Sequence, residues 1–252
     1  REGLTLTGRE KGLQLFDDPR LAFLFGELGD PNMLLFMYFS FWYSFVNDYW
    51  YPKGGLMTLA DILASKYQEM GGEVKLSTTV DRILTSGTTA IGVETAEGEQ
   101  YFAEKIVNTG NPKRLVTQMI DASLIPGKYG ETIKNGPVSY SMSTAFLGLD
   151  MDDGELARNL KCTHTLYWRN YGFTESNYDP DIHRKGMSMF TWCSMHDKSL
   201  APAGQNSIIV QVRTPYHWMN GWGTGSEDPT VRTEDYRKLK EKVLDGVIED
   251  SE

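Results

Sequence analysis

The sequence predicts an α+β fold in which a mainly antiparallel sheet packs with helices. Four segments are rich in β-branched, aromatic and small residues, and loops rather than helical crossovers separate them, which is typical of antiparallel pairing. A smaller set of short strands with tight turns precedes them and predicts a β-meander. The four long segments are residues 139–150, 162–168, 186–195 and 207–212.

Two longer helices are predicted by apolar residues that recur every three or four positions. Gly54 and Gly55 open the first, and Gly71-Gly72 ends it, because glycine readily adopts the left-handed conformation that closes a helix. Its apolar stripe is Leu56, Leu59, Ile62, Leu63, Tyr67 and Met70. The second covers residues 233–248, with the stripe Tyr236, Leu239, Val243 and Val247.

The predicted meander lies between these helices. Ser86-Gly87 and Glu97-Gly98 are turn signals between alternating segments. The predicted strands are residues 73–77, 80–85, 89–95, 100–104 and 105–110. A short helix over 113–120 and a loop-rich passage over 123–138 then lead to the first long strand. Another short helix is predicted over 21–28, after Pro19.

Composition and charge exclude some classes of function. The chain has 252 residues, enough for one or two domains with a substantial core. Lys plus Arg is 25 and Asp plus Glu is 34, so the formal charge is 25 − 34 = −9. Nucleic-acid-binding surfaces carry basic patches. We therefore expect no nucleic-acid partner.

Residues 33–46 form an unusual run of fourteen residues with no charge and seven aromatic rings. A membrane-spanning helix needs about 20 residues, so this run is too short to cross a bilayer. It predicts a helix buried nearly all round. The functional alternative is the wall or mouth of a long apolar pocket, because aromatic and Met side chains line such pockets. Contact of this run with lipid is left open.

The cysteines and histidines indicate no metal site. Cys162 and Cys193 are expected to be two small buried side chains, although they lie in two predicted strands that could face each other. The four histidines are too far apart in the sequence to suggest a metal centre, and structural or surface roles are expected for them. They are His164, His183, His196 and His217.

Four motifs resemble one family of flavoproteins. They are YPKGG at 51–55, GGEVKLSTTVDRI at 71–83, KIVNTGNPKRL at 105–115, and a D-x-S-x-A-P-x-G stretch at 197–204. Together they resemble the phytoene desaturase, carotenoid isomerase and retinol saturase group of the amine oxidase-like flavoproteins. The fourth motif by itself predicts only a polar turn whose shape is fixed by proline.

The resemblance implies FAD as cofactor and a division into three parts. Residues 53–112 would be a remnant of the FAD-binding domain, and residues 1–52 and 113–252 would be two parts of a substrate domain. The cofactor-binding residues that it implies are Gly54, Gly55, Val80, Asn108, Thr109 and Gly110. The substrate-binding residues that it implies are Phe36, Tyr38, Phe39, Trp42 and Tyr43.

Members of this group also carry an N-terminal dinucleotide-binding fingerprint and a C-terminal flavin-contacting segment, and neither is found in these 252 residues. We therefore expect an internal fragment that is inactive alone and does not retain FAD. No catalytic acid or base is assigned from the sequence.

The resemblance implies an FAD-dependent oxidoreductase that acts on a long apolar substrate, such as a carotenoid, retinoid or other isoprenoid. Hydride exchange with the flavin would support desaturation, saturation or isomerisation. The alternative is a carrier of lipids or isoprenoids without redox chemistry, as in the GDP-dissociation inhibitors. A third alternative is an unrelated α+β domain. A cytoplasmic location is expected, with peripheral membrane contact and oligomeric state left open.

Overall fold

The computed structural model of the chain describes residues 2–26, 32–47, 50–136, 141–170, 176–226 and 231–251. The chain divides into two compact units. Residues 1–61 and 139–252 form the first, which we call the sheet unit, and residues 62–138 form the second, which we call the meander unit. The three-part division proposed from the sequence stays a prediction.

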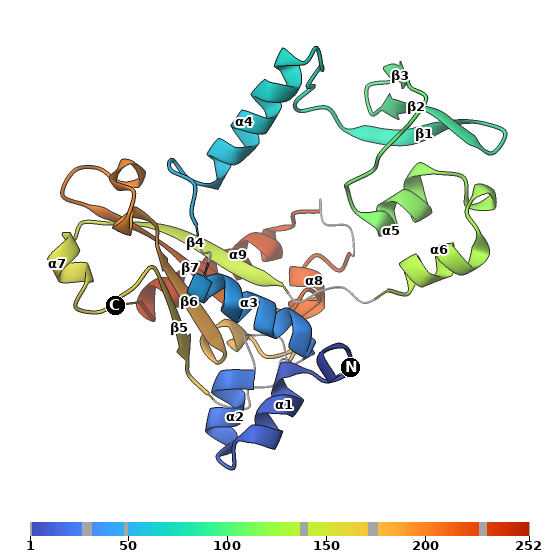
Figure 1. Ribbon diagram of the computed structural model, residues 1–252. Coiled ribbons are helices and arrows are strands. Elements are labelled where there is room, and N and C mark those ends of the chain that lie inside the picture. Colours follow the sequence, from blue (N-terminus) through green and yellow to red (C-terminus); the bar gives the residue numbers. More distant parts are fainter. Residues whose placement is uncertain are drawn as a thin grey trace. The chain divides into compact units, whose positions relative to one another are not determined.

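The sheet unit contains most of the regular structure (Figure 1). Its helices are α1 Gly8–Leu15, α2 Pro19–Gly26, α3 Leu35–Asn47, α7 Asp153–Leu156, α8 Trp218–Trp222 and α9 Glu234–Glu249. Its strands are β4 Met142–Leu149, β5 His164–Trp168, β6 Met187–Trp192 and β7 Asn206–Arg213. Helix α4, Leu56–Glu69, crosses the boundary between the units.

The four strands form one antiparallel sheet in the order β4-β7-β6-β5, which confirms the predicted fold class. Residues that lie directly opposite each other in an antiparallel pair share one face of the sheet. Ala145 pairs with Val210, Val210 with Phe190, and Phe190 with Thr165. Every second residue along each strand joins the same face, so the register assigns all four strands to two faces.

One face of the sheet is closed by the main hydrophobic core. Along β7, residues 206, 208, 210 and 212 are all buried, and they lie on the face that also holds Ala145 and Trp192. Val243 and Val247 of α9 pack into the same core, as the sequence stripe predicted. The other buried members are Leu156, Leu160, Ile182 and Trp218. We call this side the closed face.

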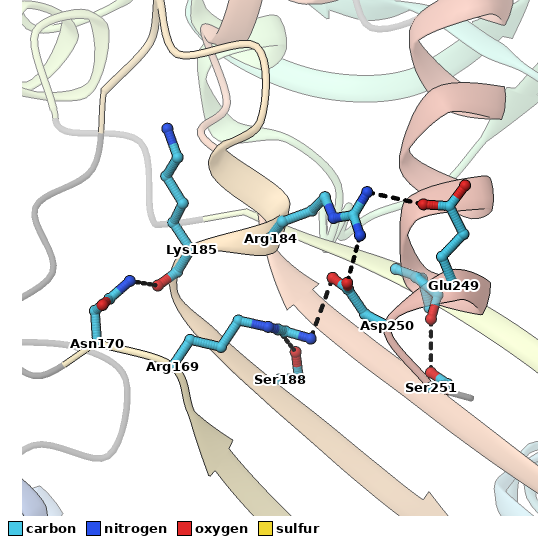
Figure 2. Close-up of polar contacts among 9 residues, drawn as sticks. Arg169, Asn170, Arg184, Lys185, Ser188, Glu249, Asp250 and Ser251 are labelled. Atoms are coloured by element: carbon cyan, nitrogen blue, oxygen red, sulfur yellow. Dashed lines mark hydrogen bonds and ion pairs between the residues drawn. The ribbon is translucent and has the colours of Figure 1, made fainter.

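Ionic contacts fasten the C-terminal end of α9 to the sheet unit (Figure 2). The Arg184 guanidinium binds Glu249 at 2.9 Å and Asp250 at 2.7 Å. Arg169, which follows β5, pairs with Asp250 at 3.1 Å and donates to the Ser188 hydroxyl at 2.8 Å. Asp250 therefore lies between two arginines, and this geometry fixes α9 over the closed face.

The other face of the sheet meets the N-terminal helices. The ring of Phe45 in α3 lies edge-on to His164, with centroids 6.4 Å apart, and Phe23 of α2 lies edge-on to Trp168 at 4.7 Å. His164 and Trp168 are four residues apart in β5, so they share a face, opposite to Thr165. We call this side the open face. Leu35, at the start of α3, donates its N–H to the Leu6 carbonyl at 2.8 Å, which ties α3 to the segment before α1.

The meander unit holds a second, smaller antiparallel sheet in the order β1-β2-β3. Its strands are β1 Val80–Ser86, β2 Thr89–Thr95 and β3 Gln100–Phe102, and its helices are α5 Pro112–Arg114 and α6 Gly127–Lys134. The predicted meander is therefore present. Helix α5 continues as a π-helical turn, Leu115–Met119, close to the predicted helix over 113–120.

Three local predictions for this part of the chain are wrong. Residues 73–77 and 105–110 form no strand, although both were predicted as strands. Alternation and apolarity make a strand only where a neighbouring strand supplies hydrogen bonds, and none of the described strands pairs with them. The passage 123–138 was predicted to be loop-rich, but α6 occupies its middle, starting after Pro126; its last two residues lie outside the described part.

The expectation that the aromatic run is buried nearly all round is also wrong. In α3 only Leu35 and Tyr38 are buried, and the remaining apolar side chains are exposed or partly exposed. Cys162 is exposed rather than buried, whereas Cys193 is half-buried, and both are free thiols. Among the described helices, none combines the length and apolarity needed to cross a membrane.

Candidate functional site

The exposed side of α3 forms an apolar groove with the segment around α1. The groove has a volume of about 1120 Å³. We call it the α3 groove; it is lined by Gly3, Lys11, Leu35, Phe36, Phe39, Ser40, Trp42, Tyr43, Ser44, Val46 and Asn47. Four of the five predicted substrate residues, Phe36, Phe39, Trp42 and Tyr43, thus lie along one surface. At 1.5 Å per residue, α3 is about 20 Å long, so the surface suits an extended chain.

Tyr38, the fifth predicted substrate residue, lies elsewhere. Its side chain is 4% exposed and packs edge-on against Phe39 and Trp42, with centroids 5.9 and 6.2 Å away. Its hydroxyl has no hydrogen-bond partner within the described residues. Burial raises the pKa of Tyr38, so this side chain stays neutral. Tyr38 shapes the aromatic packing of α3 from beneath, and the structure does not bring it into the groove.

The open face of the sheet adds a second apolar surface on the side of α2 and α3. Two of its cross-strand rows are exposed or half-buried, whereas Met187 and Arg213 on the same face are buried. The first is Thr144, Gln211, Met189 and Leu166, and the second is Phe146, Ile209, Thr191 and His164. None of these eight side chains is fully buried, and Phe146 is 77% exposed. These two rows form an exposed, mainly apolar surface, in contrast to the closed face.

Two polar pairs lie on the open face. The Nδ1 atom of His164 is 3.0 Å from the Thr191 hydroxyl oxygen, and the Gln211 amide donates to the Thr144 hydroxyl at 3.3 Å. Burial lowers the pKa of His164, which favours a neutral imidazole at physiological pH. These two rows of the open face are therefore apolar with two neutral polar pairs, which suits a hydrophobic ligand, whereas Arg213 lies buried on the same face.

The glycine turn ahead of α4 is held by a residue far along the chain. Gly54 and Gly55 have φ of +83° and +90°, values that favour glycine over any other residue. The Gly54 N–H donates to the Asp197 carboxylate at 2.5 Å. Asp197 opens the D-x-S-x-A-P-x-G stretch, so two of the four motifs meet at this hydrogen bond.

The remaining predicted cofactor residues belong to the meander unit. Val80 is half-buried, begins β1 opposite Thr95, and accepts a hydrogen bond at its carbonyl from Arg114 at 3.5 Å. Asn108, Thr109 and Gly110 are exposed. The Asn108 side-chain oxygen accepts from the Gly110 N–H at 3.2 Å, which bends the chain just before α5.

A second cavity of about 600 Å³ lies in the sheet unit between edge strand β4, α8 and α9. Its walls are mainly apolar and include Met142, Trp222 and Val243, with Lys240 of α9 among the lining residues. None of the predicted site residues lines it. Within the described residues, no group of three or more His, Cys, Asp or Glu side chains could hold a metal ion.

Residues 4–215 match the sequence profile of a family described as flavin containing amine oxidoreductase. The chain belongs to this family. The match includes α3, the glycine turn, the whole meander unit and all four strands of the larger sheet.

Several curated proteins are similar to the chain. A phytoene desaturase (lycopene-forming) of Pantoea ananas is 22% identical over 79% of this chain and 40% of its own length. A chloroplastic prolycopene isomerase of Daucus carota is 24% identical over 79% of this chain and 29% of its length. A solved oxidoreductase from Methanosarcina mazei superposes with a TM-score of 0.49 at 16% identity, covering 79% of this chain and 38% of that one. The chain thus spans about 40% or less of these relatives.

The residues of the glycine turn fit the flavin that the family implies. A Cβ atom added to Gly55 would meet nothing closer than 3.8 Å, whereas one added to Gly54 would lie 2.7 Å from the Thr58 hydroxyl oxygen. The turn therefore depends on glycine and carries no side chains of its own at these two positions. Asn108 to Gly110 likewise form an exposed, sharply bent segment. Both features suit a cofactor that is approached closely by backbone atoms.

Two residues of this region were not identified as functional candidates from the sequence. Asp197 was interpreted as part of a polar turn, and His164 as a structural or surface histidine. The alternation of β5 would have placed His164 on the same face as Leu166, but only the register identifies that face as open. Nothing in the sequence pairs Asp197 with Gly54, which is 143 positions away.

Proposed function

We propose that the chain is the substrate-binding portion of an FAD-dependent oxidoreductase that acts on a long apolar, polyene-like substrate. The observation that carries this proposal is the α3 groove, an aromatic surface of about 1120 Å³ in a member of the flavin amine oxidoreductase family. The curated relatives named above include proteins that act on carotenoids by desaturation and isomerisation, according to their names.

The chain's own residues would bind and orient the substrate. Phe36, Phe39 and Tyr43 would contact an extended apolar chain along α3. The partly exposed rows of the open face, with Phe146 on the edge strand β4, would offer a further apolar surface. Burial of apolar area supplies roughly 25 cal/mol for each Å² removed from water, so a long polyene gains affinity along its whole length.

As the resemblance implies, backbone atoms of Gly54 and Gly55 in the sheet unit would contact the flavin, and the same role is proposed separately for Val80 and for Asn108 to Gly110 in the meander unit. When bound, FAD would exchange a hydride with a substrate carbon. The described residues assign no catalytic acid or base. We also propose a cytoplasmic location, with α3 available for peripheral contact with lipid because its side chains there are uncharged and exposed.

The test is to express the longest product of the reading frame that encodes this chain, load it with FAD, and supply carotenoid and retinoid substrates in micelles. We expect a shift in the polyene absorbance together with reduction or reoxidation of the flavin. Phe39→Ser should lower turnover of the apolar substrates. Tyr178→Ser, which removes an aromatic side chain that is 84% exposed outside the groove, is the matched control and should leave turnover unchanged.

The alternative is a carrier that binds an isoprenoid without redox chemistry. A wild-type protein that binds polyenes but holds no flavin would support the carrier and contradict the oxidoreductase. A protein that holds flavin but turns over no member of either substrate panel would contradict the proposed substrate class.

A further inference from the structure

The turn at Gly54 and Gly55 donates a hydrogen bond to Asp197, a residue far along the chain. Locally, the Gly55 N–H donates to the Pro52 carbonyl at 3.0 Å, and the Thr58 N–H donates to the Gly55 carbonyl at 3.2 Å. Two consecutive left-handed residues cost conformational freedom, because glycine loses more of it on folding than any other residue. The Gly54 N–H points away from these local bonds and donates to Asp197 instead.

The Asp197 carboxylate is oriented for this contact by its neighbours. Its Oδ1 atom accepts from the Ser199 hydroxyl at 2.6 Å and from the Ser199 N–H at 3.0 Å, which leaves Oδ2 for Gly54. The Ser199 hydroxyl, followed by the Gly54 N–H and the Ser199 N–H, lowers the pKa of Asp197. The carboxylate is therefore ionised at neutral pH, and hydrogen bonds to ionised groups are the stronger ones.

The loop that carries Asp197 rests on a buried polar network. The Asn206 side-chain oxygen accepts from the Trp192 indole at 2.8 Å and from the Ser194 hydroxyl at 2.6 Å. The Ser207 hydroxyl donates to the Leu200 carbonyl at 2.9 Å, on the far side of Asp197. Both ends of the loop are thus fastened to β7. The loop therefore holds the Asp197 carboxylate in a fixed position, as a positioning residue requires.

We propose that Asp197 is a positioning residue of the flavin site, which holds the Gly54–Gly55 turn in the conformation that faces the cofactor. This inference rests on the proposed function, in which that turn lies against FAD. Asp197 contacts the turn through backbone Gly54 and is not assigned a contact with flavin or substrate. Its loss would leave the sheet intact and free the turn to sample other conformations.

The first measurement uses this chain without cofactor. Hydrogen exchange of the Gly54 amide, followed by NMR, should be about tenfold faster in Asp197→Ala than in the wild type, since a lost hydrogen bond of about 1.4 kcal/mol corresponds to that factor. Asp197→Asn keeps an acceptor oxygen and should give a smaller change. Lys198→Ala, in the same loop, removes an exposed ion pair with Asp153 and should leave Gly54 exchange unchanged.

The second measurement uses the FAD-loaded product of the full reading frame. In Asp197→Ala we expect the dissociation constant of FAD to rise about tenfold and the flavin absorbance band to change shape, because a mobile turn alters the environment of the cofactor. Lys198→Ala should match the wild type in both. Lys198→Ala and Asp197→Ala alter the same loop. A change in the absorbance spectrum that occurs only in Asp197→Ala therefore indicates a role in positioning and not a general loss of stability.

The outcomes separate the two proposals. A wild type that holds no flavin contradicts the proposed function and, with it, this inference. A wild type that holds flavin, together with an Asp197→Ala variant of unchanged affinity and spectrum, overturns only the inference. Unchanged Gly54 exchange in Asp197→Ala also overturns it, whatever the flavin does. Should Asp197→Ala fail to fold, the same comparisons are made with Asp197→Asn, and wild-type values in that variant count against the inference.

Discussion

The two faces of the β4-β7-β6-β5 sheet are built from the same strands but differ in how far their side chains are buried. The closed face is filled by α9 and a core that includes Val210 and Trp218, and Asn206 accepts a buried hydrogen bond there from the Trp192 indole. The open face leaves Phe146 in contact with solvent and carries partly exposed polar pairs such as Gln211 with Thr144, although Arg213 is buried there. Because the buried core lies on the closed face, we expect substitutions there to change stability more than substitutions on the open face.

The largest expected effect comes from Trp218 on the closed side. Its side chain is 0% exposed, packs edge-on against Trp222 at 4.9 Å, and donates its indole N–H to the Asp179 carbonyl at 2.7 Å. Trp218→Ala should lower the free energy of unfolding by about 4 kcal/mol, because it opens a large cavity. Urea denaturation of the two proteins measures this.

The matched control is Trp42→Ala in α3, which is 37% exposed. It should cost less than half as much, since its partners can relax and solvent fills the space. Equal losses for the two tryptophans would contradict the contrast between the faces.

Asn206 gives the next largest effect. Replacing it with Leu keeps the volume but leaves the Trp192 indole N–H and the Ser194 hydroxyl buried without their acceptor. We expect a loss of about 3 kcal/mol, in line with the desolvation of two unpaired donors. On the open face, Gln211→Leu breaks a partly exposed contact with Thr144 and should change stability by less than about 0.5 kcal/mol.

The sequence correctly predicted the elements that pack against each other in the structure. Alternation along β7 and the stripe on α9 indicated the closed face because both partners lie in this chain. The same alternation at residues 73–77 and 105–110 predicted strands that do not form, since periodicity reports a preference and not a partner. The hydrophobicity of residues 33–46 likewise predicted burial, because it reports a preference for burial and not the residues that would cover the helix.

The candidate site was predictable only in part. The aromatic run and the glycine pair stand out in the sequence, and four of the five aromatic candidates do line one groove. Their relation to the sheet depends on tertiary register, which decides that His164 faces α3 while Thr165 faces the other way. The contact between Asp197 and Gly54 is a long-range hydrogen bond, for which no local pattern exists.

The pH dependence of stability should come mainly from the closed side, through His183. Burial lowers the pKa of His183, with Lys242 and Arg184 adding to this effect and Asp181 and Asp250 opposing it. An unfolded imidazole titrates near 6.5, so below that pH the unfolded chain binds more protons than the folded one. The contribution of His183 is therefore fully present above about pH 6.5 and is lost as the pH falls through its lowered folded value.

The measurement for His183 is the free energy of unfolding between pH 7.5 and pH 5, values chosen on either side of about 6.5. His183→Phe should flatten this profile. Burial also lowers the pKa of His164 on the open face. His164→Phe should nevertheless flatten the pH profile less than His183→Phe, because the His164 imidazole has a hydroxyl partner in Thr191. The Nδ1 atom of His183 is buried and has no hydrogen-bond partner in the described part of the chain.

A small effect on stability, together with a loss of polyene affinity, is expected at Phe146. Because its side chain is 77% exposed, Phe146→Ser should change the free energy of unfolding by less than about 0.5 kcal/mol. Its β7 partner Ile209 would lose an apolar neighbour on the open face, so polyene affinity should fall several-fold. Fluorescence quenching by a bound polyene measures the affinity, and Phe102→Ser, an exposed aromatic residue of the meander unit, is the control. A large loss of stability with unchanged polyene affinity would show that the open face is structural and that the ligand binds elsewhere.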